Sequence, residues 1–214
     1  MPFTSKTRHF STPMVQPLRP QAPKFRVCKG LPLRLSQSLN ASLGQRVLSS
    51  IHGLPALTGS PILVSTLPEL TAHGGKLLSG RLDRGTPVHA ASFIRRREIV
   101  LETALLQKHD LPLILVHELF HFVWVRLGNT KRAEYAALLA EELRLGARGE
   151  LGESSAVRKE IAVSSRDYVC ESFCDTAAWL YAPSSKSRPV RLALRWQNKR
   201  KDWFSASLKA PLKC

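Results

Sequence analysis

Residues 111–128, LPLILVHELFHFVWVRLG, constrain the fold of this chain more than any other stretch. Apart from His117, Glu118 and His121, every side chain from position 113 to position 125 is apolar. On an α-helix, at about 100° per residue, His121 falls about 40° and Glu118 about 100° from His117. The three polar side chains therefore share one side of a helix that is otherwise apolar all round, and such a helix belongs inside a core.

Two explanations fit this helix: a metal site, or ordinary core histidines whose nitrogens find hydrogen-bond partners. A buried carboxylate beside two imidazoles needs strong partners, because burying an unpaired charge is costly. Side chains at positions i and i+4 lie one turn apart, so nitrogens of His117 and His121 can reach one ion at about 2.0–2.1 Å. Glu118 is turned away from that ion but can reach a water beside it, as the general base of an HExxH metallopeptidase does. We therefore favour the metal site.

A second group of polar side chains lies in YVCESFCDTAAW, residues 168–179. The pattern predicts a helix over residues 156–182, which follows a Gly/Glu/Ser linker and breaks near Ser164–Ser165. Glu171, Asp175 and Tyr168 share one face of this helix, at about 0°, 40° and 60° on the helical wheel. A catalytic zinc site with two histidines needs a carboxylate from another element, and metal-bound histidines usually donate their second nitrogen to a further carboxylate. Glu171 suits the first role and Asp175 the second. Asp175 and His89 are the alternative third ligands, and a pair of solvated acids is the alternative to both roles.

HELFH followed by E-x-x-x-D on a later helix resembles the gluzincin type of zinc metallopeptidase, the thermolysin-like clan in the broad sense, over about residues 86–182. The resemblance implies an α+β, zincin-like and helix-rich fold, with a small sheet packed on the active-site helix. It also implies an edge strand ahead of that helix that pairs with an extended substrate, for which residues 97–102 are the best candidate. The residue roles that it implies are zinc ligation by His117, His121 and Glu171, base catalysis by Glu118, and orientation of a histidine by Asp175.

Two features depart from the pattern of this family. The segment between His121 and Glu171 is long, so an inserted amphipathic helix at residues 131–148 has to be accommodated. No histidine follows His121, so no histidine is available downstream to stabilise the oxyanion. Tyr168 is the candidate for that catalytic role, and a core or rim tyrosine is the alternative.

The remaining histidines and cysteines carry weaker signals. His73 and His89 are isolated, which is typical of structural or exposed histidines. Cys170 and Cys174 share a helix face to one side of Glu171, which favours small buried residues over a thiolate metal site. No CxxC pair occurs among the four cysteines, so the thiols are expected to be reduced in an intracellular protein.

The net charge of +16 first suggests a nucleic-acid binder. The excess lies in the flanks, however: residues 1–68 hold eight basic and no acidic residues, and residues 176–214 hold nine basic and one acidic. Residues 69–175 hold fifteen of each sign and no nucleic-acid motif. This distribution favours solvated flanks around a neutral central region, with nucleic-acid or membrane-surface binding by the flanks as an alternative.

These observations predict three regions: a basic, disordered tail (1–42), a zincin-like metallopeptidase domain (43–182) and a basic C-terminal extension (183–214). No apolar run reaches the about 18 residues that a transmembrane helix needs. A cytoplasmic protein is expected, although the acid-free, Arg/Ser-rich N-terminus leaves organellar targeting open. The predicted function is zinc-dependent hydrolysis of a peptide or protein substrate. A zinc-binding regulatory protein with little or no catalysis is a further alternative, and the oligomeric state stays open.

Overall fold

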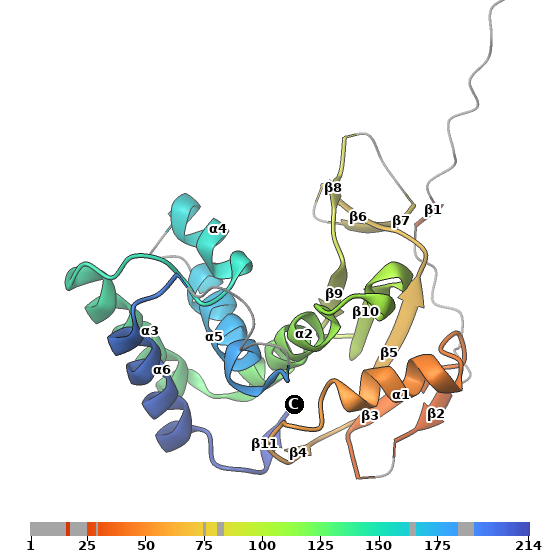
Figure 1. Cartoon of the computed structure of the whole chain (residues 1–214), viewed down its shortest axis with the longest axis horizontal. Coiled ribbons are helices and arrows are strands. Elements are labelled where there is room, and N and C mark those ends of the chain that lie inside the picture. Colours follow the sequence, from red (N-terminus) through yellow and green to blue (C-terminus); the bar gives the residue numbers. More distant parts are fainter. Residues whose placement is uncertain are drawn as a thin grey trace, which may run out of the picture.

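The computed structural model describes residues 16–17, 25–28, 30–74, 76–80, 84–162, 166–183 and 191–214. These residues form an α+β fold of six α-helices and three small sheets (Figure 1). The helices are α1 (Ala41–Ser49), α2 (Leu111–Arg126), α3 (Asn129–Arg144), α4 (Glu153–Ala162), α5 (Arg166–Tyr181) and α6 (Leu194–Ser207), with a 3₁₀ helix at Thr103–Gln107. The strands are β1 (Gln16–Pro17), β2 (Phe25–Val27), β3 (Leu33–Ser36), β4 (Leu57–Thr58), β5 (Ile62–Leu67), β6 (Leu70–His73), β7 (Lys76–Ser79), β8 (Thr86–Pro87), β9 (Ala90–Phe93), β10 (Glu98–Glu102) and β11 (Leu212–Lys213).

The largest sheet has five strands in the order β2-β3-β5-β10-β9. Its three central strands, β3, β5 and β10, are parallel, and β2 and β9 pair antiparallel at the two edges. The register places Leu35, Val64 and Ile99 in one row across the central strands, and all three are buried. Side chains alternate between the two faces of a strand, so this row gives one face of the sheet an apolar surface.

Helix α2 is the central element of the fold and lies between the sheet and α5 (Figure 1). It is apolar on nearly every side, and Leu115, Val116, Phe120 and Phe122 are fully buried. Pro112 lies in its first turn, where the missing N–H removes no helical hydrogen bond. Gly128, with φ of 80°, ends the helix and leads directly into α3. Among the described residues, no helix has both the length and the apolar character needed to cross a membrane.

Several elements expected from the sequence are confirmed. The helix predicted at residues 111–128 is α2, the one at 131–148 corresponds to α3, and the segment 97–102 contains β10, which begins at Glu98. The helix predicted at 156–182 is two helices, α4 and α5; the predicted break at Ser164–Ser165 lies outside the described residues.

The predicted domain boundaries need correction at both ends. Strand β3 pairs with β5 in the main sheet, and its Leu33 is completely buried, so the fold includes described residues before position 43. Helix α6 likewise packs its Phe204 into the core, and β11 pairs with β4. Alternating and helical apolar positions within these basic segments supply the buried contacts, which net charge alone does not reveal.

Candidate metal centre

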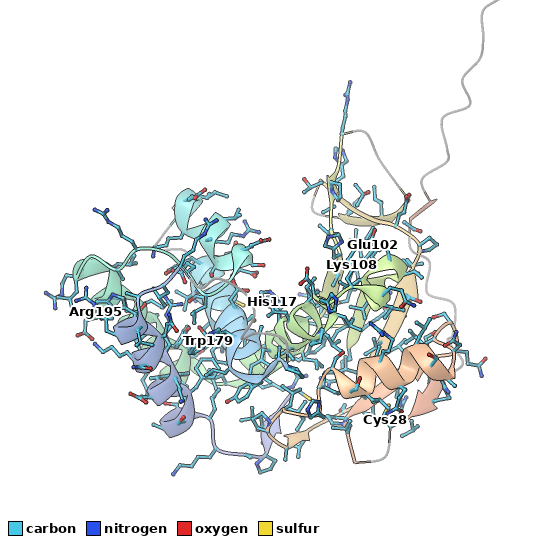
Figure 2. The ribbon with its side chains drawn as sticks, in the orientation of Figure 1. Cys28, Glu102, Lys108, His117, Trp179 and Arg195 are labelled. Carbon is cyan, nitrogen blue, oxygen red and sulfur yellow. The ribbon has the colours of Figure 1, made fainter. Side chains whose placement is uncertain are left out.

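Helices α2 and α5 bring the predicted histidines and carboxylates together. The two helices run in opposite directions: His117 lies beside Asp175, whereas His121, one turn later on α2, lies beside Cys170, which comes earlier on α5. The buried Ala178 on α5 carries only a methyl group, which lets the helices approach closely. In Figure 2, His117 lies where α2 meets α5.

Glu171 faces both histidines, through the Nε2 atom of each ring. Its Oε2 lies 3.1 Å from His117 Nε2, and its Oε1 lies 3.9 Å from His121 Nε2. The centroids of the two imidazole rings are 4.9 Å apart, and the ring planes are inclined at 76° to each other. In a tetrahedral site with bonds of about 2.0–2.1 Å, neighbouring ligand atoms are separated by about 3.3 Å. The two distances from Glu171 lie on either side of that value, so this carboxylate is within reach of an ion held by either histidine.

Asp175 binds the other nitrogen of His117. Its Oδ1 lies 2.8 Å from His117 Nδ1, and its Oδ2 accepts a hydrogen bond of 2.8 Å from the backbone N–H of Ser155. Gly152 makes room for this carboxylate, because a Cβ at that position would lie only 2.2 Å from Asp175 Cγ. A carboxylate held in this way orients the imidazole and keeps its proton on Nδ1, which leaves Nε2 free for a metal.

Two thiols of α5 border the same site. Cys170 Sγ lies 3.5 Å from His121 Nδ1. Cys174 is fully buried, and its Sγ lies within 4.8 Å of a ring nitrogen of His117 and of His121, which makes it a second candidate for the third ligand. We favour Glu171, because its two oxygens face the Nε2 atoms at 3.1 and 3.9 Å.

Glu118 lies on the same helix as the histidines and is directed towards β9. The hydroxyl of Ser92, on β9, is placed to donate to a carboxylate oxygen of Glu118 and, at 2.9 Å, to its backbone carbonyl. The charge of Glu118 nevertheless acts on the site, since it contributes to raising the pKa of both His117 and His121. The carboxylate predicted as the base is therefore beside the histidines but separate from the two carboxylates that contact their rings.

The carboxylates determine the electrostatics of the site. Burial alone would lower the pKa of His117, but hydrogen bonds to Asp175 and Glu171 outweigh burial and raise the pKa well above its ordinary value. Burial would raise the pKa of Glu171 and of Asp175, but the contacts with His117 dominate and lower both. The site therefore favours a positive charge, which is either a proton on an imidazole or a metal ion in its place.

Tyr168 lies outside this site, which corrects its predicted role in catalysis. Its side chain is buried, and its hydroxyl donates a hydrogen bond of 2.6 Å to Glu150. Burial, and then the charge of Glu150, raise the pKa of Tyr168. The position of Tyr168 on the helical wheel could not show that a buried carboxylate from another segment would accept a hydrogen bond from its hydroxyl.

The other candidate histidines also have separate surroundings. His89 Nδ1 pairs with Glu102 at 2.6 Å, so the structure does not bring it to the two histidines of α2. His73 Nδ1 lies 3.2 Å from the carbonyl oxygen of Arg84.

Four contributors to the site had no clear signal in the sequence. Cys170 was interpreted only as a small buried residue, and the segment that contains Gly152 only as a linker between helices. Ser155 and Ser92 act through hydrogen bonds to residues distant in the chain, one to Asp175 and the other to Glu118. Such contacts depend on the packing of separate elements, so residue spacing does not reveal them.

Comparisons of the chain with protein-family models, with curated proteins and with solved structures found no match. Two imidazole nitrogens combined with a carboxylate or a thiolate are donors that zinc accepts, and His117 and His121 have both Glu171 and Cys174 beside them.

Proposed function

We propose that this protein is a zinc-dependent peptidase with a zincin-like arrangement around α2. One observation carries the proposal: the Nε2 atoms of His117 and His121 face the same carboxylate, Glu171, while Asp175 occupies Nδ1 of His117. Ordinary core histidines need only an acceptor for each N–H. A buried carboxylate, Asp175, and a partly buried one, Glu171, around two neutral imidazoles would instead leave negative charge without a cation, which is costly away from water.

The residues of the chain have distinct roles in this proposal. Zinc, when bound, supplies Lewis acidity that polarises a carbonyl group and makes a nearby water easier to deprotonate. Glu118 accepts the proton of that water and passes it to the leaving amine. Ser92 holds the Glu118 carboxylate in position, and Asp175 holds His117 in the tautomer that presents Nε2.

The strand that pairs with the substrate has to be reassigned. The expectation for residues 97–102 is wrong, because they form β10, whose two edges are occupied by β5 and β9. In the described part of the chain, β9 is the outermost strand on this side of the sheet, and its Ser92 contacts Glu118. We propose that an extended substrate adds to the outer edge of β9, which would place its backbone beside the base.

A pocket of about 620 Å³ supports a peptide substrate with a large side chain. Its walls include Leu113 of α2 and Trp179 of α5, each one helical turn from His117 or Asp175. Figure 2 shows Trp179 and His117 on these two helices. The other walls carry charged side chains of both signs, among them Arg148, Glu153 and Lys159. We propose that a large side chain next to the scissile bond enters this pocket, with its body against Leu113 and Trp179 and a polar end towards the charged walls.

Metal analysis combined with a peptide-mixture assay tests the proposal. The purified protein should bind about one zinc per chain and cleave a defined mixture of peptides, read out by mass spectrometry. Glu118→Gln should retain zinc and lose about 10²–10⁴-fold in rate, because glutamine fills the space but cannot accept the proton. Glu141→Gln is the matched control, since Glu141 is an exposed carboxylate paired with Lys199.

The possible results separate the alternatives. Absence of zinc uptake after reconstitution would overturn the metal site. Zinc uptake without cleavage of any peptide would favour a zinc-binding regulatory protein. Cleavage by Glu118→Gln at the wild-type rate would show that Glu118 is not the base.

A further inference from the structure

Cys170 stands in the same relation to His121 as Asp175 does to His117. Asp175 Oδ1 lies 2.8 Å from Nδ1 of His117, and Cys170 Sγ lies 3.5 Å from Nδ1 of His121. Both partners come from α5, the helix that also carries Glu171. Each histidine therefore has its Nε2 towards Glu171 and its Nδ1 towards a different side chain of the same helix.

A histidine that binds a metal through Nε2 carries a proton on Nδ1, and that proton needs an acceptor. The acceptor fixes the tautomer and the rotation of the ring. Sulfur is a weaker acceptor than a carboxylate oxygen, and its hydrogen bonds are longer. A separation of 3.5 Å between Cys170 Sγ and His121 Nδ1 suits such a bond, and within the described ranges no other hydrogen-bond partner of this nitrogen is found.

We propose that Cys170 is a positioning residue of the metal site, whose sulfur accepts the Nδ1 proton of His121 and turns Nε2 towards Glu171. This inference rests on the proposed zinc site. The two histidines then have hydrogen-bond acceptors of unequal strength: the Asp175 carboxylate for His117 and the weaker Cys170 sulfur for His121. The bond forms whether the sulfur is a thiol or a thiolate, because a lone pair on sulfur is present in both.

The simpler interpretation of Cys170 is a small residue that fills space in the core. Its burial argues against that as the whole explanation. Cys174, one turn later, is completely buried, whereas Cys170 is only partly buried, and its sulfur is directed at a ring nitrogen. A residue that only filled space would have no requirement for an atom able to accept a hydrogen bond.

Zinc affinity of the full-length chain tests this role, measured by competition with a chelating dye under reducing conditions. Cys170→Ala should weaken zinc binding about tenfold, at the lower end of the range for removal of a histidine partner, because sulfur is a weak acceptor. Cys170→Ser should restore most of the affinity, since its oxygen accepts the same proton. The control is Cys28→Ala, which removes a buried sulfur beside β3, away from His117 (Figure 2), and should leave zinc binding unchanged.

Nuclear magnetic resonance supplies a readout that a space-filling role would not change. In the zinc-loaded chain with ¹⁵N-labelled histidine, the Nδ1–H groups of His117 and His121 should both give signals protected from exchange with water. Cys170→Ala should remove or broaden the His121 signal and leave the His117 signal, which Asp175 protects.

The outcomes distinguish this inference from the function on which it rests. A wild-type chain that takes up no zinc overturns both. Zinc uptake by the wild type, with unchanged affinity and an unchanged His121 signal in Cys170→Ala, overturns the role of Cys170 alone. A His121 proton found on Nε2 in the zinc-loaded chain overturns it as well.

Discussion

Two ionic clusters contact α5, one through Ser172 and the other through Glu171 and Asp175, and they differ in how their charges are balanced. The Arg200 cluster contains Glu142 and Glu150, both of which bind the completely buried guanidinium of Arg200, at 2.7 and 2.8 Å. Lys159 adds a second permanent cation, 3.1 Å from Glu150. The Ser172 hydroxyl oxygen accepts a further hydrogen bond, of 3.0 Å, from the guanidinium of Arg200. In this cluster two carboxylates meet two permanent cations, so the charges cancel.

The histidine cluster, which consists of His117, His121, Glu171 and Asp175, also has two carboxylates but no permanent cation. Its imidazoles are neutral unless they take up a proton, and their ordinary pKa is about 6.5. The Arg200 cluster therefore has balanced charges within the chain, whereas the histidine cluster has a net negative charge when both imidazoles are neutral. The Arg200 cluster needs nothing and joins α6 to α3 and to the segment ahead of α4. The histidine cluster requires a proton or a metal ion to balance its carboxylates.

The largest predicted effect is on the Arg200 cluster. Arg200→Met leaves Glu142 and Glu150 buried without their main cation, so the free energy of unfolding should fall by about 3–5 kcal/mol. Denaturant unfolding monitored by circular dichroism measures this change. Lys199→Met is the control, because its exposed pair with Glu141 should contribute almost nothing to the unfolding midpoint. A small effect of Arg200→Met would show that the cluster is dispensable for the fold.

The next effect concerns the histidine cluster and its third ligand. Asp175→Ala should weaken zinc binding about 10–100-fold, which is typical for loss of a histidine partner. Glu171→Ala should weaken it far more, because two imidazoles alone hold zinc poorly. Isothermal titration or chelator competition compares the two variants. If Glu171→Ala binds zinc as tightly as the wild type and Cys174→Ala does not, the third ligand is the thiolate, and the assignment of Glu171 is wrong.

The histidine cluster could be predicted from the sequence because its signals are local. Three polar side chains on one side of an apolar helix, and two carboxylates one turn apart on another, are visible as spacing within short segments. The approach of Glu171 to both histidines follows once the two helices pack side by side. Tyr168 shares the same predicted face, yet its hydroxyl donates a hydrogen bond to Glu150. Glu150 lies in a segment between helices, whose position cannot be predicted from helical periodicity.

The Arg200 cluster could not be predicted, and neither could the order of the strands. Arg200 belongs to a strongly basic segment, where charge indicates a solvated surface, and only the partners contributed by α3 and by the loop before α4 explain its burial. Likewise, β10 has the composition of a strand, but nothing in residues 97–102 indicates that β9 will cover its second edge. The first feature arises from contacts between distant segments, and the second depends on how β10 is shared between the preceding strand β9 and the more distant β5.

The segment between the two clusters gives the third prediction. Gly152 lies between Glu150, which binds Arg200, and Ser155, which binds Asp175. Because a Cβ at position 152 would lie 2.2 Å from Asp175 Cγ, Gly152→Ala should push the carboxylate away from His117. We expect zinc affinity to fall about 10–100-fold, as for loss of the carboxylate itself. Ser154→Ala, an exposed neighbour, is the control. Unchanged affinity in Gly152→Ala would mean that Asp175 does not support the metal.

The smallest effect is a pH dependence that only the histidine cluster should show. In the zinc-free protein the pKa of His117 is raised, because hydrogen bonds to Asp175 and Glu171 outweigh burial. The protonated form therefore stabilises the fold fully below the unfolded-state pKa of about 6.5, and this contribution is lost as the pH rises through the higher folded-state pKa. Each unit by which the pKa is raised corresponds to about 1.4 kcal/mol. Arg200 should not make the free energy of unfolding depend on pH in this range, because burial would lower its already high pKa but its contacts with Glu142 and Glu150 raise it, and it stays charged.

The difference in unfolding free energy between the wild type and His117→Asn isolates this contribution, since other titrating groups largely cancel in the subtraction. Without zinc, the advantage of the wild type should shrink as the pH rises above about 6.5. With zinc bound, the metal replaces the proton, so the advantage should instead grow with pH as fewer protons compete for the imidazoles. An advantage that does not change with pH in either condition would mean that His117 binds neither a proton nor a metal within the folded protein, and the histidine cluster would then be as self-contained as the Arg200 cluster.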